Sequence, residues 1–136
     1  MCDALMSEKL TVLAVDDDPE NLMLLVNLLK PLYKVKVANS GKRALEIVMA
    51  AGGALDLILL DVMMPEIDGF EVCAQLKASP LTQAIPIIFL TSKNETIDKK
   101  AGVELGAVDY IVKPIDPQCV KERIATHLMR RISEPK

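Results

Sequence analysis

Polar side chains follow four of the apolar segments in this chain, at the point where each segment ends. They are the acidic run Asp16-Asp17-Asp18, the aspartate Asp61, the hydroxyl of Thr91 and the ammonium of Lys113. In an open sheet of parallel strands, ligands bind beyond the carboxyl ends of the strands. These side chains therefore predict one shared site, provided that the apolar segments are strands of a single sheet.

Carboxylates brought together in this way need a cation. If the strands before Asp16 and Asp61 are neighbours, about 4.8 Å apart, then Asp16, Asp17 and Asp61 repel one another and raise each other's pKa. A hard divalent cation relieves that repulsion, and a site with few carboxylates and a phosphate-bearing substrate suits Mg²⁺. Lys113 adds a second cation, and Thr91 offers a hydroxyl to the same incoming group.

The chemistry that fits this set is transfer of a phosphoryl group to an aspartate. An ionised carboxylate needs no general base to attack phosphorus, and Mg²⁺ with Lys113 offsets the cost of bringing two anions together. The aspartyl phosphate formed is a mixed anhydride that water hydrolyses, so the modified state is temporary. A single aspartate after a strand is more often a cap or turn residue, and the prediction therefore depends on the whole set. Asp18 is better explained as a helix cap.

The elements that must position these side chains alternate along the chain. Five apolar segments have the length of strands: Leu10 to Val15, Val35 to Ala38, Leu57 to Leu60, Ile87 to Leu90 and Tyr110 to Val112. Five helices are expected. The first is capped by Asp18 and begins at Pro19, the second is capped by Ser40, the third opens at Asp68-Gly69, the fourth runs from about Asn94 to Leu105, and the fifth begins at Pro117 after Asp116. Right-handed crossovers place such helices on both faces of a parallel sheet. The sequence predicts a doubly wound α/β fold.

Composition narrows the class of protein. With 136 residues, of which 51% are hydrophobic, one domain with one sizeable core is expected. A net charge of −3 and the absence of Trp argue against direct nucleic-acid binding and against an anionic membrane surface. Three cysteines without metal-ligand spacing predict free thiols. Met1 to Leu10 has no basic segment followed by an apolar run, so we expect a soluble cytoplasmic protein.

Four motifs in order resemble the receiver domain of response regulators, the phosphoacceptor module of two-component signal transduction. They are VDDDPEN after the first strand, LLDVMMPEIDG around Asp61, FLTS at Thr91 and DYIVKP at Lys113. The resemblance covers residues 10 to 128 and is of the chemotaxis-regulator type. It implies a flavodoxin-like fold, with a five-stranded parallel sheet in the order 2-1-3-4-5 and five flanking helices.

The resemblance also assigns roles to individual residues. It implies that Asp61 is phosphorylated, that Asp17 binds Mg²⁺ directly and Asp16 through water, and that Mn²⁺ could replace Mg²⁺. The backbone carbonyl of Met63 would be a third metal ligand. Thr91 is similar to the hydroxyl that moves toward the phosphoryl group, Lys113 to the essential cation with a cis peptide before Pro114, and Tyr110 to an aromatic switch residue. From the sequence alone, Tyr110 is better explained as an ordinary half-buried strand residue.

The resemblance implies partners as well. The phosphoryl donor would be a sensor histidine kinase or a histidine phosphotransfer protein. The signal would leave through the face of the fourth helix, fifth strand and fifth helix, toward an output domain, an effector protein or a second copy in a homodimer. We expect residues 1–9 to be an N-terminal extension, residues 10–128 the receiver domain, and residues 129–136 a tail or the start of a linker. No conventional enzyme activity is expected beyond self-catalysed phosphotransfer and dephosphorylation.

Other functions fit the sequence less well. A haloacid-dehalogenase-type phosphatase needs a second aspartate two places after the first, where this chain has Met63. A flavodoxin-like nucleotide binder needs N–H donors and small residues after its first strand, where three aspartates would repel a phosphate. A pseudo-receiver that signals without phosphorylation is a further alternative. His127 is expected to be a surface residue, because the chain has no helical bundle that could present a phosphodonor histidine.

The lifetime of a phosphorylated state is also open to prediction. In the family it depends on the side chains two places after the phosphoacceptor and two places after the Thr, which here are Met63 and Lys93. Neither is an amide or an acid that would readily position a water. The sequence therefore predicts a long-lived phosphoryl group.

Overall fold

The computed structural model of the chain describes residues 10–92 and 106–133, with side chains up to Met129. These residues form a five-stranded parallel sheet in the order β2-β1-β3-β4-β5. The strands are β1 Thr11–Val15, β2 Lys34–Ala38, β3 Leu57–Asp61, β4 Ile87–Ser92 and β5 Asp109–Lys113. The predicted strand order is confirmed, with β2 and β5 at the edges of the sheet.

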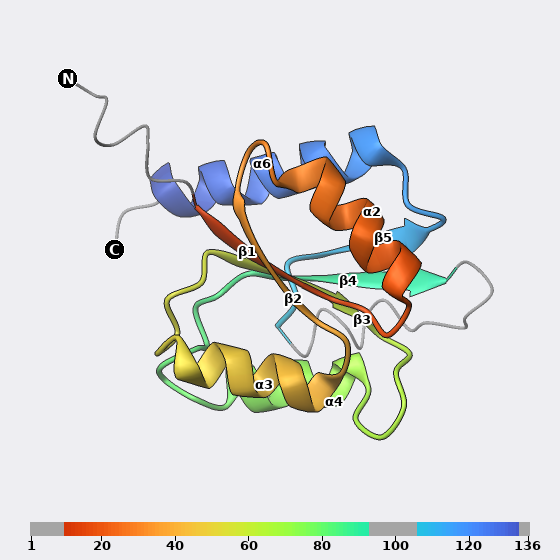
Figure 1. The fold of residues 1–136 in the computed structure, drawn as a ribbon. Coiled ribbons are helices and arrows are strands. Elements are labelled where there is room, and N and C mark those ends of the chain that lie inside the picture. Colours follow the sequence, from red (N-terminus) through yellow and green to blue (C-terminus); the bar gives the residue numbers. More distant parts are fainter. Residues whose placement is uncertain (1–9, 93–105, 134–136) are drawn as a thin grey trace.

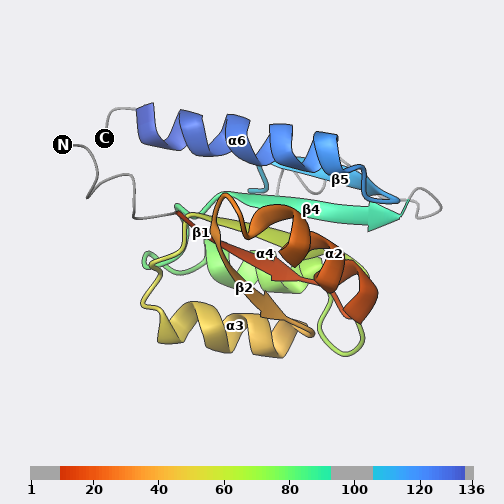
Figure 2. The same cartoon turned by 45° about the horizontal axis from the view of Figure 1, so that its top comes forward.

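Helices cover both faces of the sheet (Figures 1 and 2). The described helices are α2 Pro19–Leu29, α3 Gly41–Ala50, α4 Gly69–Lys77 and α6 Pro117–Ser133. The pair α2 and α6 lies on one face, and the pair α3 and α4 lies on the other. Within the described residues, no helix combines the length and the apolar character needed to cross a bilayer.

The central strands are apolar because both of their sides are buried. In β3, all five residues are buried, as expected for a parallel strand between two helical layers. Alternate strand residues divide between two apolar clusters. The α3/α4 cluster takes Leu13, Val15, Ala38, Ile58, Leu60, Ile87 and Phe89 from the strands. The α2/α6 cluster takes Val12, Ala14, Leu57, Leu59, Ile88, Leu90 and Ile111.

Local capping starts three of the helices where the sequence predicts. The side chain of Asp18 accepts from the backbone N–H of Glu20 at 2.9 Å, and Pro19 occupies the first turn, where an N–H would have no partner. Ser40 and Asp68 cap α3 and α4 in the same way. Asp18 is therefore a helix cap, as expected.

The element boundaries differ from the prediction at several ends. β3, β4 and β5 extend one or two residues further than predicted, because ladder pairing continues through Asp61 to Leu90 and through Thr91 to Val112. Asp61, Thr91 and Lys113 thus belong to the strands rather than following them. The fifth helix continues past residue 128 to Ser133, since the sequence has no helix breaker before Pro135. The helix expected from about Asn94 to Leu105 lies outside the described residues.

The expectation that His127 is a surface residue is wrong, because its side chain is only 10% exposed. Its Nε2–H donates to Asp109 Oδ2 at 2.9 Å, and Arg123 Nη1 contacts Asp109 Oδ1 at 2.6 Å. Residues 123 and 127 are one turn apart on α6, and both reach the first residue of β5. This cluster fastens α6 to the edge strand.

The pKa of Asp109 reflects these contacts. Burial alone would raise the pKa of its carboxyl, but hydrogen bonds from His127, from the N–H of Tyr110 and from Arg123 lower it below its usual range. A carboxyl with a depressed folded-state pKa stabilises the fold above its unfolded pKa of about 3.9, and this stabilisation is lost as the pH falls through the folded value.

We therefore expect Asp109→Asn to lower the free energy of unfolding at pH 7 by about 1–2 kcal/mol, a value reduced because Arg123 is 45% exposed. The difference from the wild type should shrink as the pH approaches 3. Urea unfolding monitored by circular dichroism between pH 3 and pH 7 measures both effects. A variant as stable as the wild type throughout would contradict this role of Asp109.

Candidate functional site

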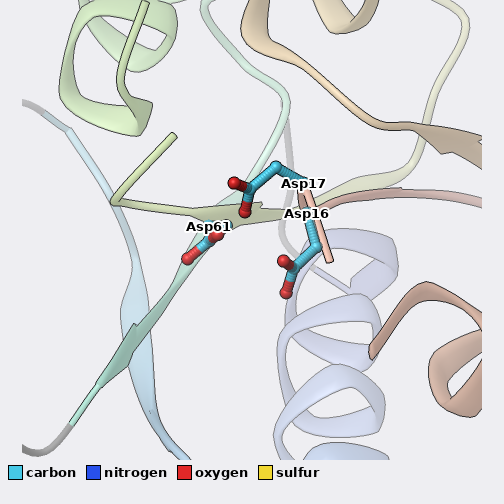
Figure 3. A group of neighbouring side chains, drawn as sticks. All are labelled: Asp16, Asp17 and Asp61. Carbon is cyan, nitrogen blue, oxygen red and sulfur yellow. The ribbon is translucent and has the colours of Figure 1, made fainter. Parts of the chain in front are cut away.

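Three carboxylates meet at the carboxyl ends of β1 and β3. Asp16 and Asp17 directly follow β1, and Asp61 is the last residue of β3 (Figure 3). Asp16 is 0% exposed and Asp61 2% exposed, whereas Asp17 lies in solvent. One carboxylate oxygen from each residue lies within 4.8 Å of the others. The backbone fixes this arrangement, because β1 and β3 are paired through Val15 and Leu60 and the N–H of Asp16 bonds the carbonyl of Ala38.

Lys113, from the far edge of the sheet, joins two of these carboxylates. Its Nζ lies 3.0 Å from Asp16 Oδ2 and 3.2 Å from Asp61 Oδ1. Asp61 and Lys113 each come two residues after a strand residue of the α2/α6 cluster, so pleating directs both side chains to that face. β4 lies between β3 and β5, and the long lysine side chain spans it.

The electrostatics of the site are unbalanced toward negative charge. Burial raises the pKa of Asp61 to about 7; the charge of Asp16 adds to this effect, while Lys113 opposes it. Burial alone would lower the pKa of Lys113, but hydrogen bonds and charges from Asp16 and Asp61 outweigh burial and raise it. Among the described residues, both ion pairs of these two carboxylates are made by Lys113. One ammonium therefore faces three carboxylates.

This donor set fits a hard divalent cation. The oxygens of Asp16, Asp17 and Asp61 are the ligand type that Mg²⁺ prefers, and one exposed carboxylate leaves room for the waters that Mg²⁺ retains. A second positive charge would also favour the ionised form of Asp61, whose pKa is raised by burial and by the charge of Asp16. The cluster of aspartates predicted from the sequence is thus present with suitable chemistry.

The predicted hydroxyl and aromatic residues lie on β4 and β5, the strands that follow β3 in the sheet. Thr91 follows Phe89 by two residues in β4 and is 4% exposed. Tyr110 is half-buried, pairs in register with Phe89 and packs against the α3/α4 cluster. The two residues therefore share one side of adjacent strands. Tyr110 has the packing of a half-buried strand residue, and its role as a switch stays a prediction.

The loop after Asp61 is held tightly against the strand. Gly69, the first residue of α4, donates its N–H to the carbonyl of Val62 at 2.8 Å. A Cβ atom at this position would collide with the carbonyl oxygen of Asp61 and would lie 2.9 Å from Val62 Cα. Met63 lies within this loop with its side chain 61% exposed, and the role of its carbonyl stays a prediction. The predicted cis peptide between Lys113 and Pro114 is confirmed.

Two polar contacts of Asp16 were not predicted. The amide of Asn21 donates from Nδ2 to Asp16 Oδ2 at 3.2 Å, and the N–H of Asp18 donates to Asp16 Oδ1 at 3.0 Å. Asn21 is the third residue of α2. The first helical turn after a strand-end acid returns toward that acid, so the VDDDPEN motif carries a signal for this contact.

Comparison with known proteins agrees with this geometry. The family model of the response regulator receiver domain matches residues 12–125. The chain belongs to the response regulator receiver family. This receiver domain is 43% identical over 114 residues to the response regulator PleD of Caulobacter vibrioides, covering 83% of this chain and 25% of PleD. It is 44% identical over 120 residues to the transcriptional regulatory protein PhoP of Bacillus subtilis, covering 88% of this chain and 48% of PhoP.

A solved structure shows the same fold. The receiver domain superposes on the chemotaxis protein CheY4 of Vibrio cholerae with a TM-score of 0.80 at 29% identity, covering 87% of this chain and 98% of CheY4. The chain spans between a quarter and about half of the length of the curated relatives it matches. The predicted flavodoxin-like architecture is thus confirmed, as is the prediction that the chain is a receiver domain of a two-component response regulator. The family match and the cluster of Asp16, Asp17 and Asp61 give the pseudo-receiver alternative no support.

The raised pKa of Asp61 has a consequence for stability. A carboxyl with a folded-state pKa of about 7 and an unfolded pKa of about 3.9 destabilises the fold increasingly as the pH rises between these values. Removing the charge removes this penalty, and Lys113 retains Asp16 as a partner.

In a metal chelator at pH 8, we expect Asp61→Asn to raise the free energy of unfolding by an amount on the order of 2–4 kcal/mol. The gain should be small at pH 4. Mg²⁺ should narrow the difference at pH 8, because a cation that binds the folded wild type stabilises it. Denaturant unfolding at the two pH values measures the effect, and an Asn variant less stable than the wild type at pH 8 would refute this account of the site.

Proposed function

We propose that Asp61 is the phosphoacceptor of this receiver domain. The observation that carries the proposal is the placement of Lys113 Nζ at 3.2 Å from Asp61 Oδ1, beside two further acidic residues. The ammonium favours the ionised carboxylate, which is the nucleophile, and can remain close to the oxygens of an incoming phosphoryl group. Asp61 is fixed at the end of a fully buried strand, so that little reorganisation is needed.

The transfer is a substitution at phosphorus. An oxygen of Asp61 forms a bond to phosphorus while the bond from phosphorus to the donor breaks, and the donor keeps the electron pair. The donor is a phosphohistidine of a sensor histidine kinase or of a histidine phosphotransfer protein. In the reverse direction, water attacks the aspartyl phosphate and releases inorganic phosphate, which returns Asp61 to its free carboxylate.

We propose that Asp16, Asp17 and Asp61, with the carbonyl of Met63, hold Mg²⁺ or Mn²⁺. When bound, the cation supplies positive charge that neutralises the oxygens of the phosphoryl group. Lys113 supplies the protein's own positive charge from the other side. Thr91 offers its hydroxyl to the phosphorylated residue. Tyr110 changes its orientation together with Thr91, because the two residues lie on the same side of neighbouring strands.

The output of this receiver domain is proposed to be a contact between one of its faces and a partner. Residues 10–128 form the signalling unit, in line with the family match to residues 12–125. The face that includes β5 and α6 is proposed to contact an output domain, an effector protein or a second copy, with a shift between two conformations on phosphorylation. The curated relatives are longer than this chain. The proposed partners of this face therefore include output domains of the kind found in larger response regulators.

Phosphorylation is tested with a small donor. After incubation with acetyl phosphate and Mg²⁺, we expect the intact mass of the wild type to increase by one phosphoryl group, and we expect chelation of Mg²⁺ to abolish the increase. Asp61→Asn should gain no phosphoryl group. Asp68→Asn is a matched control, because Asp68 caps α4 in the following loop and Asn caps a helix equally well. A wild type that gains no adduct, or an Asp61→Asn variant that gains one, would show the proposal to be wrong.

The lifetime of the phosphoryl group is a separate prediction. The exposed Met63 side chain offers no group that could hold an attacking water, whereas Lys93 lies outside the described residues. We expect slow loss of the adduct after removal of the donor, and a several-fold faster loss in Met63→Asn. Met49→Asn, at a similarly exposed methionine on α3, should leave the rate unchanged. Rapid loss from the wild type that chelation does not slow would contradict the prediction.

A further inference from the structure

Asn21 contacts the most deeply buried acid of the site. Its Nδ2 donates to Asp16 Oδ2 at 3.2 Å, from the first turn of α2. Capping of this helix does not use the Asn21 side chain, because Asp18 Oδ1 accepts the N–H of Glu20. A role in starting the helix therefore does not explain the contact.

In the described part of the chain, three donors contact the Asp16 carboxylate, and each is directed at one of its two oxygens. Oδ1 accepts the N–H of Asp18 at 3.0 Å, and Oδ2 accepts from both Asn21 and Lys113. Asp16 is 0% exposed, so water cannot readily replace a donor that is lost. A buried carboxylate that loses a donor retains the cost of its desolvation. The orientation of Asp16 therefore depends on these three contacts.

Lys113 is the donor that has two tasks. It lies at 3.0 Å from Asp16 Oδ2 and at 3.2 Å from Asp61 Oδ1. If it follows the phosphoryl group on Asp61, its contact with Asp16 weakens. Asn21 then remains on the same oxygen of Asp16. The amide is neutral, so it orients the carboxylate without adding a charge that would compete with a metal ion.

We propose that Asn21 is a positioning residue that holds the Asp16 carboxylate in the orientation used for the divalent cation, and that frees Lys113 to pair with the phosphoryl oxygens. This inference rests on the proposed function for the second role only. The first role concerns binding of the metal alone and can be measured without any phosphoryl donor. Partners that orient metal ligands typically contribute between 10- and 100-fold to metal affinity.

The test is a titration of the protein with Mg²⁺ alone, followed by the backbone amide signals of the site in NMR spectra. Asn21→Leu has nearly the same shape but no donor, and Asn21→Ser has a shorter side chain. We expect both variants to bind Mg²⁺ about tenfold more weakly than the wild type. Asn27→Leu and Asn27→Ser are matched controls on the exposed side of the same helix and should bind within about twofold of the wild type.

A double-mutant cycle separates positioning from general structural damage. If Asn21 acts through Asp16, then Asn21→Leu should weaken Mg²⁺ binding by less than about twofold when Asp16→Asn is already present. An equal loss in both backgrounds would overturn the proposal. Thermal unfolding is measured first. If Asn21→Leu is unfolded, Asn21→Ser decides, and if both are unfolded, Asn21 is a structural residue and the proposal is wrong.

Failure of this inference is distinguishable from failure of the proposed function. A wild type that binds Mg²⁺ but gains no phosphoryl group refutes phosphorylation of Asp61, and with it the second role of Asn21, while the titration still decides the first. A wild type that is phosphorylated, with Asn21 variants that bind Mg²⁺ as tightly, refutes the role of Asn21 alone. If metal binding is weakened as expected, phosphorylation at saturating Mg²⁺ tests the second role, and equal rates in Asn21→Leu and wild type would refute it.

Discussion

The shared contact of one lysine with two buried aspartates is the constraint on which the rest of the site depends. Lys113 approaches Asp16 and Asp61 from the edge strand β5, across the intervening strand β4. The distances require β1, β3 and β5 to keep their register and twist. The spacing of the strands therefore determines where the Lys113 ammonium, from the edge of the sheet, meets the carboxylates near its centre.

The same contact leaves the site electrostatically unbalanced. Burial and, to a smaller extent, the charge of Asp16 raise the pKa of Asp61, and a single ammonium opposes them only in part, so the ionised form of Asp61 is under electrostatic stress. Any added positive charge or any loss of an anion relieves that stress. Sites that respond to ligands generally have this property, because a ligand shifts an equilibrium only when it interacts differently with the two states.

Much of this arrangement could be predicted from the sequence. Unbroken apolar residues in β3 indicated a strand buried on both faces, and polar residues at strand ends indicated where the site lies. The exact ends of β3, β4 and β5 could not be predicted, because the pattern of apolar residues stops at Asp61 and Lys113 whereas backbone pairing continues through them.

Contacts between side chains that are distant in the sequence could not be predicted either. The burial of His127 depends on Asp109, 18 positions earlier, and on how α6 crosses the start of β5. Nothing in the local sequence around His127 reports that crossing. The contact of Asn21 with Asp16 is local, and the VDDDPEN motif carries a signal for it, but an Asn in the first turn of a helix does not by itself identify its partner.

The close approach of Gly69 to the carbonyl of Asp61 has a mechanical consequence. The first turn of α4 rests directly on the main chain of Asp61, with no side chain between them to absorb a displacement. A displacement of the Asp61 main chain toward α4 would therefore require the first turn of this helix to move as well. The absence of a Cβ atom at one residue thus couples the rigid sheet to an element on its surface.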